Sequence, residues 1–344
     1  MQKLRFYFKE AVQQSASDVH LVGGAKPMLR IEGELVDLQE AHLEADTLKD
    51  AIYQLLSKDQ VKKFEEDKEL DFGFNFENER FRVNLHQQQD TIAMAARLIP
   101  RDIPTPEMLK FEPTLLDFTK LLDGLVLVTG PTGCGKSTVI ASMIEEINKT
   151  RRAHIVSIED PIEFIFKNNK SLIEQREVGA DTRSFANALK YVLRQDPNVI
   201  FVGEMRDPET IATVVTAAET GHLVFSTLHT SSAAEAVERI VDVFEGSKQR
   251  QILIQLSTVL RGVITQQLIP AKDGGRVPAR EILINTPAVA NLIRESSIGQ
   301  IKSVIQTSAK DGMITLESSI QSLIHEGWVD PIVGGNRSGR RKIW

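Results

Sequence analysis

Cysteine is almost absent from this chain, because its 344 residues include only Cys134. A single thiol excludes both an intrachain disulfide framework and a zinc site built from the cysteines of one chain. Long apolar runs are also missing. None approaches the ~20 residues that a membrane-spanning helix needs, and no secretory signal opens the sequence. We therefore expect a cytoplasmic protein.

Aromatic residues and an excess of positive charge are scarce as well. Aromatics make up 6% of the residues, and 41 basic residues stand against 47 acidic ones, for a net charge of -6. Channels for nucleic acid depend on basic grooves and on aromatic side chains that stack with bases. The composition therefore argues against a nucleic-acid partner. The length exceeds the ~100–200 residues of a usual single domain and predicts two domains.

One stretch of the sequence carries a complete phosphate-binding motif. An apolar run, Leu125 to Thr129, predicts a buried strand, and Ser137 to Asn148 predicts a helix with one apolar face. Between them the chain matches G-x-x-x-x-G-K-[ST], in which glycines let backbone N–H groups surround an anion. The residues that we expect to bind the nucleotide are Gly130, Pro131, Thr132, Gly133, Cys134, Gly135, Lys136, Ser137 and Thr138.

The motif also assigns roles to two side chains. Lys136 is expected to contact the β- and γ-phosphates of ATP, and the hydroxyl of Ser137 is expected to hold Mg²⁺. ATP and Mg²⁺ are therefore the cofactors that the sequence predicts.

The chain organisation changes along the sequence. Residues 1–100 alternate apolar and polar positions in several short segments and predict a small α+β domain, followed by a proline-containing linker over 101–113. Residues 114–333 alternate strands with helices, which predicts an α/β domain with a mostly parallel sheet and helices on both faces. The basic tail 334–344 is expected to be disordered.

Ligands of such sheets bind beyond the carboxyl ends of the strands, and several polar residues follow strands here. Glu204 ends an apolar run and occupies a Walker B position, where it would hold Mg²⁺ or its water. Glu163 is the preferred general base, with Glu159 and Asp160 as alternatives. His229 is positioned to donate to the γ-phosphate. In contrast, His222 falls at the opposite end of its strand.

Four segments, 130–138, 158–164, 199–207 and 220–229, together resemble a known family. They are similar to the Walker A, Asp box, Walker B and His box of the ATPases of type II secretion and type IV pilus systems. The resemblance extends from about Ser17 to Val329 and is greatest to the PilT/PilU group of pilus retraction ATPases. It implies a RecA-like P-loop NTPase domain and a smaller N-terminal PAS-like domain.

The resemblance also implies partners and residue roles. The family forms a homo-hexamer at the inner membrane, where it works with a platform protein and the pilin machinery, and a neighbouring subunit completes each ATP site. By resemblance Glu163 is the base, Glu204 the Walker B acid, and His222 and His229 the His box. The arginines that could supply the neighbour's charge are Arg82 and Arg97, with Arg80, Arg194 and Arg206 as alternatives.

The function we expect is ATP-driven retraction of type IV pili in twitching motility. An assembly or secretion ATPase is an alternative, disfavoured because those members usually carry a longer N-terminus and a four-cysteine zinc insertion. A PilU-like accessory is another. A nucleic-acid translocase on the same core and a nucleotide-binding scaffold without turnover are weaker alternatives.

One segment departs from the retraction members. Residues 288–295 resemble their Ala-Ile-Arg-Asn-Leu-Ile-Arg-Glu-Gly-Lys motif, but Ala290 replaces the first arginine, and Ser296 and Ser297 replace Gly-Lys. This leaves open whether the chain is a complete retraction motor or an accessory.

Overall fold

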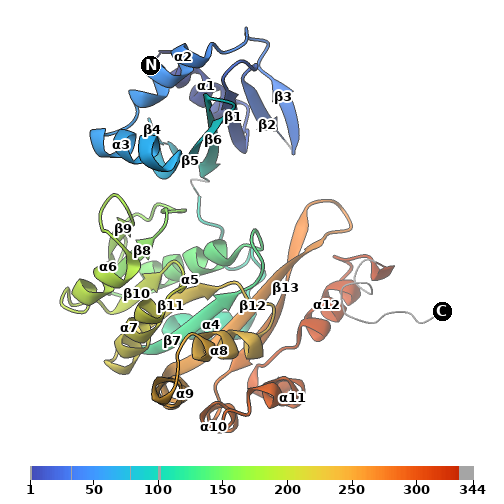
Figure 1. Cartoon of the computed structure of the whole chain (residues 1–344). Coiled ribbons are helices and arrows are strands. Elements are labelled where there is room, and N and C mark those ends of the chain that lie inside the picture. Colours follow the sequence, from blue (N-terminus) through green and yellow to red (C-terminus); the bar gives the residue numbers. More distant parts are fainter. Residues whose placement is uncertain (1, 32, 78, 100–101, 333–344) are drawn as a thin grey trace. The chain divides into compact units, whose positions relative to one another are not determined.

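The computed structural model describes residues 2–31, 33–77, 79–99 and 102–332. They divide into two compact units (Figure 1). Unit 1 contains the described residues up to Asp102 together with the short loop Pro161–Ile165, and unit 2 contains the others from Ile103 onward. Among the described residues, no helix is both long enough and apolar enough to cross a bilayer. The tail 334–344, for which we expect disorder, lies outside these residues.

The two unit boundaries differ from the domain limits expected from sequence. Residues 103–113, most of the expected linker, belong to unit 2, because the buried side chain of Arg280 binds the backbone of Leu109 and Lys110. Residue 101 of that linker is not described. Pro161–Ile165, expected within the second domain, groups with unit 1.

Unit 1 is built on one antiparallel sheet in the order β3-β2-β1-β6-β5-β4. Its strands are β1 (Asp18–Val22), β2 (Met28–Ile31), β3 (Glu34–Asp37), β4 (Glu69–Phe76), β5 (Glu79–Gln88) and β6 (Thr91–Ile99). Its helices are α1 (Gln2–Gln13), α2 (Ala45–Tyr53) and α3 (Lys58–Asp67). Ser57 and Gln60 form a capping box at the start of α3.

The alternation of residues along the strands explains which face of this sheet is buried. In β5, Phe81, Val83 and Leu85 are buried, whereas Arg82 between them is not. The buried set packs with α1, α2 and α3 in one apolar core, in which the rings of Phe8 and Phe81 lie 4.7 Å apart. The opposite face of β5 therefore carries the polar side chains.

Unit 2 is built on a sheet in the order β13-β12-β7-β11-β10-β8-β9. Neighbouring strands are parallel except for the hairpin of β12 and β13. The strands are β7 (Gly124–Thr129), β8 (His154–Glu159), β9 (Leu172–Glu177), β10 (Val199–Val202), β11 (Leu223–Leu228), β12 (Leu260–Pro270) and β13 (Arg276–Ile284). The sequence did not indicate β9, β12 or β13.

Helices cover both faces of this sheet, as predicted (Figure 1). Leu125 and Leu127 of β7 belong to one apolar core, and Val126 and Val128 belong to the other. The first core contains α6 (Phe185–Val192), α7 (Pro208–Glu219), α8 (Ala233–Asp242), α9 (Ser247–Val259), α10 (Pro287–Arg294) and α11 (Ile301–Thr307). The second contains α4 (Pro113–Lys120) and α5 (Lys136–Thr150). Helix α12 (Leu316–His325) packs on the outer part of the β12–β13 hairpin.

The segment 288–295, which departs from the retraction motif, forms most of α10. Val289 and Ile293 are buried, and Ala290 is half-buried beside them. The helix thus uses its apolar face for ordinary packing in the core of unit 2.

Candidate active site

The phosphate-binding loop connects the end of β7 to the start of α5. Gly130, Gly133 and Gly135 adopt positive φ angles of 141°, 75° and 87°. At Gly130 the packing also requires glycine, because a Cβ atom there would lie 2.3 Å from the carbonyl oxygen of Gln266. These angles let the loop turn sharply so that its backbone N–H groups and the first turn of α5 can face an anion.

The predicted loop residues have distinct environments. Pro131, Thr132 and Gly133 are exposed at the tip, and Ser137 and Thr138 are half-buried in the first turn of α5. Cys134 is buried, and burial raises the pKa of its thiol, so this cysteine stays protonated and unreactive. The exposed tip leaves the loop open to a ligand.

Lys136 lies over the loop with its stem buried. Its Nζ atom donates hydrogen bonds to the carbonyl oxygens of Gly130, at 2.9 Å, and Pro131, at 3.1 Å. A phosphate oxygen bound in the loop would offer the ammonium group a charged acceptor in place of a neutral one, which makes a stronger hydrogen bond. Lys136 is therefore held in position to contact phosphate.

His229, which follows β11, lies between Lys136 and Glu204. Its Nδ1 atom lies 3.4 Å from Lys136 Nζ, and its Nε2 atom lies 3.8 Å from Glu204 Oε2. Burial and the charge of Lys136 lower the pKa of His229, and Glu204 offsets this only in part. The imidazole is therefore neutral at pH 7, with Nδ1 as an acceptor and an N–H on the side of Glu204.

Glu204 follows β10 and has 18% of its side chain exposed. Its Oε1 atom accepts a hydrogen bond from Arg206 Nε at 2.8 Å. Carboxylate and hydroxyl oxygens are the protein ligands that Mg²⁺ prefers, and it usually takes few of them when it also binds phosphates. Glu204 and Ser137 thus have the chemistry to hold Mg²⁺ bound to ATP, which would neutralise charge on the phosphates.

The two glutamates considered for the general base have different environments. Glu159, at the end of β8, is buried and accepts hydrogen bonds from Ser157 Oγ at 2.7 Å and Gln175 Nε2 at 3.2 Å. Glu163 is exposed by comparison, and its Oε1 atom lies 3.8 Å from Arg82 Nη1 within unit 1. Glu159 is therefore held rigidly in the sheet, whereas Glu163 is on a loop. The third candidate, Asp160, is exposed.

Arg82 and Arg97 lie directly opposite each other on β5 and β6. Arg97 Nε donates to Asp18 Oδ1 at 2.8 Å, so each of the two like charges has a carboxylate beside it. Both arginines belong to unit 1, whereas Arg206 contacts Glu204 within unit 2.

The remaining alternatives have local hydrogen-bond partners. Arg194 donates to the carbonyl of Lys190, and Arg80 donates to Asn75.

His222 does not join this group of residues. It precedes β11, and its carbonyl accepts from the backbone N–H of Gly124 at the start of β7, whereas the phosphate-binding loop follows the end of β7. Its Nδ1 atom lies 2.9 Å from the carbonyl of Ala217 and 3.1 Å from Thr220 Oγ1. The structure therefore places His222 at the end of the strands opposite the phosphate-binding loop, as its position before β11 predicts.

Sequence reasoning missed two buried residues, of which Gln266 contacts the loop directly and Arg280 contacts it only through Gln266. Gln266 of β12 donates from Nε2 to the carbonyl of Cys134 at 2.6 Å, and Arg280 of β13 donates from Nε to Gln266 Oε1 at 2.8 Å. Neither lies in a recognisable motif. A buried arginine is unusual, but burial was not visible in a segment whose strands were not predicted.

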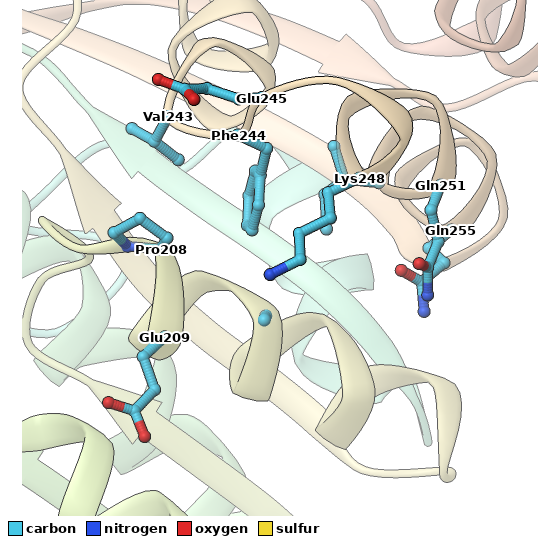
Figure 2. A pocket seen from close by; sticks show the side chains of 10 residues that line it. Pro208, Glu209, Val243, Phe244, Glu245, Lys248, Gln251 and Gln255 are labelled. Atoms are coloured by element: carbon cyan, nitrogen blue, oxygen red, sulfur yellow. The ribbon is translucent and has the colours of Figure 1, made fainter.

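A cavity of about 690 Å³ lies elsewhere in unit 2, between the start of α7 and the connection of α8 to α9 (Figure 2). Pro208 and Glu209 line one side, and Phe244 and Lys248 line the other. None of the predicted site residues lines this cavity.

Comparison with known proteins decides the family. Residues 2–297 match the family described as "Type II/IV secretion system protein". The chain belongs to this family. Its predicted fold class, with a RecA-like P-loop NTPase domain, and its predicted class as an ATPase are thereby confirmed.

Individual family members are similar over nearly the whole chain. The type IV pilus retraction ATPase PilT of Pseudomonas aeruginosa is 45% identical, with 93% of each chain covered. A twitching motility protein of Neisseria gonorrhoeae is 46% identical over 94% of this chain and 87% of its own. A crystal structure of the pilus retraction motor PilT with bound ADP is 44% identical, covers 98% of this chain and 97% of its own, and has a TM-score of 0.90.

Proposed function

We propose that this chain is a hexameric motor that hydrolyses ATP to retract type IV pili in twitching motility. The observation that carries the proposal is the group formed by Lys136, His229 and Glu204 beside an intact phosphate-binding loop, in a chain that resembles retraction ATPases over nearly its whole length. In this proposal the motor is cytoplasmic and is held at the inner membrane by the platform protein of the pilus machine, where it acts on the pilin filament.

The proposed chemistry assigns one step to each residue. Lys136 and the loop backbone bind the β- and γ-phosphates, and Ser137 and Glu204 hold Mg²⁺, which supplies charge neutralisation when bound. Glu163 takes a proton from the attacking water. His229 donates its N–H to the γ-phosphate or to a water beside it.

Two further roles depend on the ring. Arg82 and Arg97 would contribute positive charge to the site of a neighbouring subunit, in agreement with their location on the polar face of the unit 1 sheet. His222 is retained as a His-box residue through the resemblance alone.

Deleting the gene tests the direction of work. If the motor retracts pili, the deletion strain should carry surface pili that accumulate without retracting, and twitching should be lost. A plasmid copy of the parental gene should restore retraction, whereas a Lys136→Ala copy should not, because the phosphates lose their point charge. Loss of surface pili would instead identify an assembly ATPase, and normal retraction would point to an accessory role.

A further inference from the structure

Arg280 is a buried arginine whose guanidinium group donates hydrogen bonds to an amide, a carboxylate and two backbone carbonyls. Only 1% of its side chain is exposed. Its guanidinium donates to Gln266 Oε1 at 2.8 Å, to the carbonyls of Leu109 at 2.7 Å and Lys110 at 2.9 Å, and to Glu112 Oε2 at 2.9 Å. Burial disfavours the charged form of Arg280 and lowers its pKa, whereas the carboxylate of Glu112 favours the charged form and raises the pKa. Such a group is stable only while its acceptors stay in place.

Gln266 carries this network to the phosphate-binding loop. While Oε1 accepts from Arg280, Nε2 donates to the carbonyl of Cys134 at 2.6 Å. The loop also packs closely on the same residue, since Cβ atoms at Gly130 and Gly135 would lie 2.3 Å from its carbonyl oxygen and 3.0 Å from its Nε2. Gln266 is therefore a buried support for the loop backbone.

We propose that Gln266 and Arg280 are positioning residues that couple the phosphate-binding loop to residues 109–112. That segment lies in unit 2 shortly after the chain leaves unit 1 at Asp102. A shift of residues 109–112 removes two carbonyl acceptors and one carboxylate from a buried cation, so Arg280 and Gln266 must move with it. Because Gln266 binds the loop directly, the shift changes the geometry that receives phosphate.

The coupling is reciprocal by thermodynamic linkage. If the position of residues 109–112 alters nucleotide affinity, nucleotide binding must alter the position of residues 109–112. A purely structural role for Arg280, in which it only holds β13 to the segment 109–112, would not produce this effect. The proposal depends on nucleotide binding at the loop and is independent of whether the motor retracts or assembles pili.

The first test is Gln266→Glu, with ADP as the probe in a titration of the full-length protein. Glutamate keeps an acceptor for Arg280 Nε but loses the N–H donor and brings a negative charge against the carbonyl of Cys134. We expect ADP affinity to fall about tenfold or more, because a buried carbonyl loses its donor. The matched control is Gln267→Glu, the same change at the next residue, which should bind ADP like the parental protein. Parental ADP affinity in Gln266→Glu would overturn the proposal.

Arg280→Lys is the second variant, in case Gln266→Glu does not fold. Lysine keeps a positive charge beside Glu112 but lacks the planar fork that binds Gln266 and the two carbonyls together. We again expect weaker ADP binding by about tenfold. Equal binding by the parental protein and this variant would overturn the coupling alone, whereas failure of the parental protein to bind ADP would contradict the proposed function itself.

The decisive readout is the fluorescence of Trp328. The ammonium of Lys110 lies 3.5 Å from the centre of its ring, so this tryptophan reports on the segment 109–112. The chain has two tryptophans, and Trp344→Phe leaves Trp328 as the single reporter. All three proteins compared carry Trp344→Phe. We expect saturating ADP to change the emission of Trp328 in the protein with Trp344→Phe alone and in the one that also carries Gln267→Glu. The change should be lost in the protein that also carries Gln266→Glu. No change with ADP in the Trp344→Phe protein, or an equal change in all three, would refute the coupling.

Discussion

Lys136 and His229 lie side by side above the phosphate-binding loop, with Nζ and Nδ1 3.4 Å apart. They come from α5 and from the segment after β11, 93 residues later in the chain. Burial and the ammonium group both lower the pKa of His229 and favour the neutral imidazole, with a lone pair on Nδ1 and the N–H on the other nitrogen. The pair thus prepares a hydrogen-bond donor at neutral pH on the side where Glu204 lies.

This arrangement makes the stability of the protein depend on pH. Burial and Lys136 lower the pKa of His229 in the folded state, whereas an unfolded histidine titrates near about 6.5. As the pH falls below about 6.5, the unfolded chain takes up more protons, so the free energy of unfolding decreases. We expect His229→Gln to reduce this decrease, measured as the urea midpoint from about pH 7.5 to about pH 5.5.

Burial also lowers the pKa of His20, so His229→Gln should remove only part of the pH dependence. His325→Gln, at the exposed end of α12, is the control and should keep the parental slope. A slope that His229→Gln leaves unchanged would show that folding does not lower the pKa of this histidine.

Two of the three candidate bases, Glu163 and Glu159, can be separated by isosteric substitution. Glu163→Gln should keep ADP binding and lose most ATP hydrolysis, because the amide has the shape of the acid but cannot accept a proton. Glu159→Gln is the comparison, since this buried residue already accepts bonds from Ser157 and Gln175. Steady-state turnover and ADP titration measure both effects. Normal hydrolysis by Glu163→Gln together with its loss in Glu159→Gln would assign the base to Glu159.

Mixed rings test the arginines of unit 1. A Lys136→Ala subunit cannot use its own site but keeps Arg97, whereas an Arg97→Ala subunit keeps its own loop. If Arg97 acts on a neighbour's site, mixing the two should raise the ATPase rate above that of either variant alone. Arg82→Ala should behave in the same way.

Arg206→Ala is the control for that experiment. Arg206 contacts Glu204 of its own chain at 2.8 Å, so its loss should disable the same site that carries it. Mixing Arg206→Ala with Lys136→Ala should therefore give no recovery. If the Arg97 and Arg82 mixtures also fail to recover, these arginines do not act between subunits.

The end of α10 offers a test of backbone strain. Ser296 has a φ of 57°, where an L-residue is strained, and it takes the glycine place of a Schellman turn formed by the N–H groups of Ser296 and Ser297. Ser296→Gly should raise the free energy of unfolding by about 1 kcal/mol, measured by urea unfolding. Ser297→Gly, at a φ of -93°, should give no such gain. Equal effects of the two changes would show that the turn is not strained.

Segments with strong local signals were predicted well. The strand over Leu125–Thr129 agrees with β7, and the helix over Ser137–Asn148 agrees with α5 within two residues at each end, because the period of the apolar residues is a local signal. Glycine spacing likewise located the phosphate-binding loop. By comparison, β12 and β13 were missed, since a short apolar run does not reveal whether it is strand or helix until its partner strand is known.

The sequence by itself determined the loop that would hold phosphate, the acidic residue after β10 and the alternation of strands and helices that carries them, because those features depend on residues close together in the chain. The tertiary structure alone decided what surrounds them. It placed His229 against Lys136, Arg82 against Glu163, and Arg280 beneath the loop, where Gln266 bonds to a carbonyl 132 residues earlier. A buried charge or amide must find its partners in space, and no local pattern of residues specifies which distant backbone will supply them.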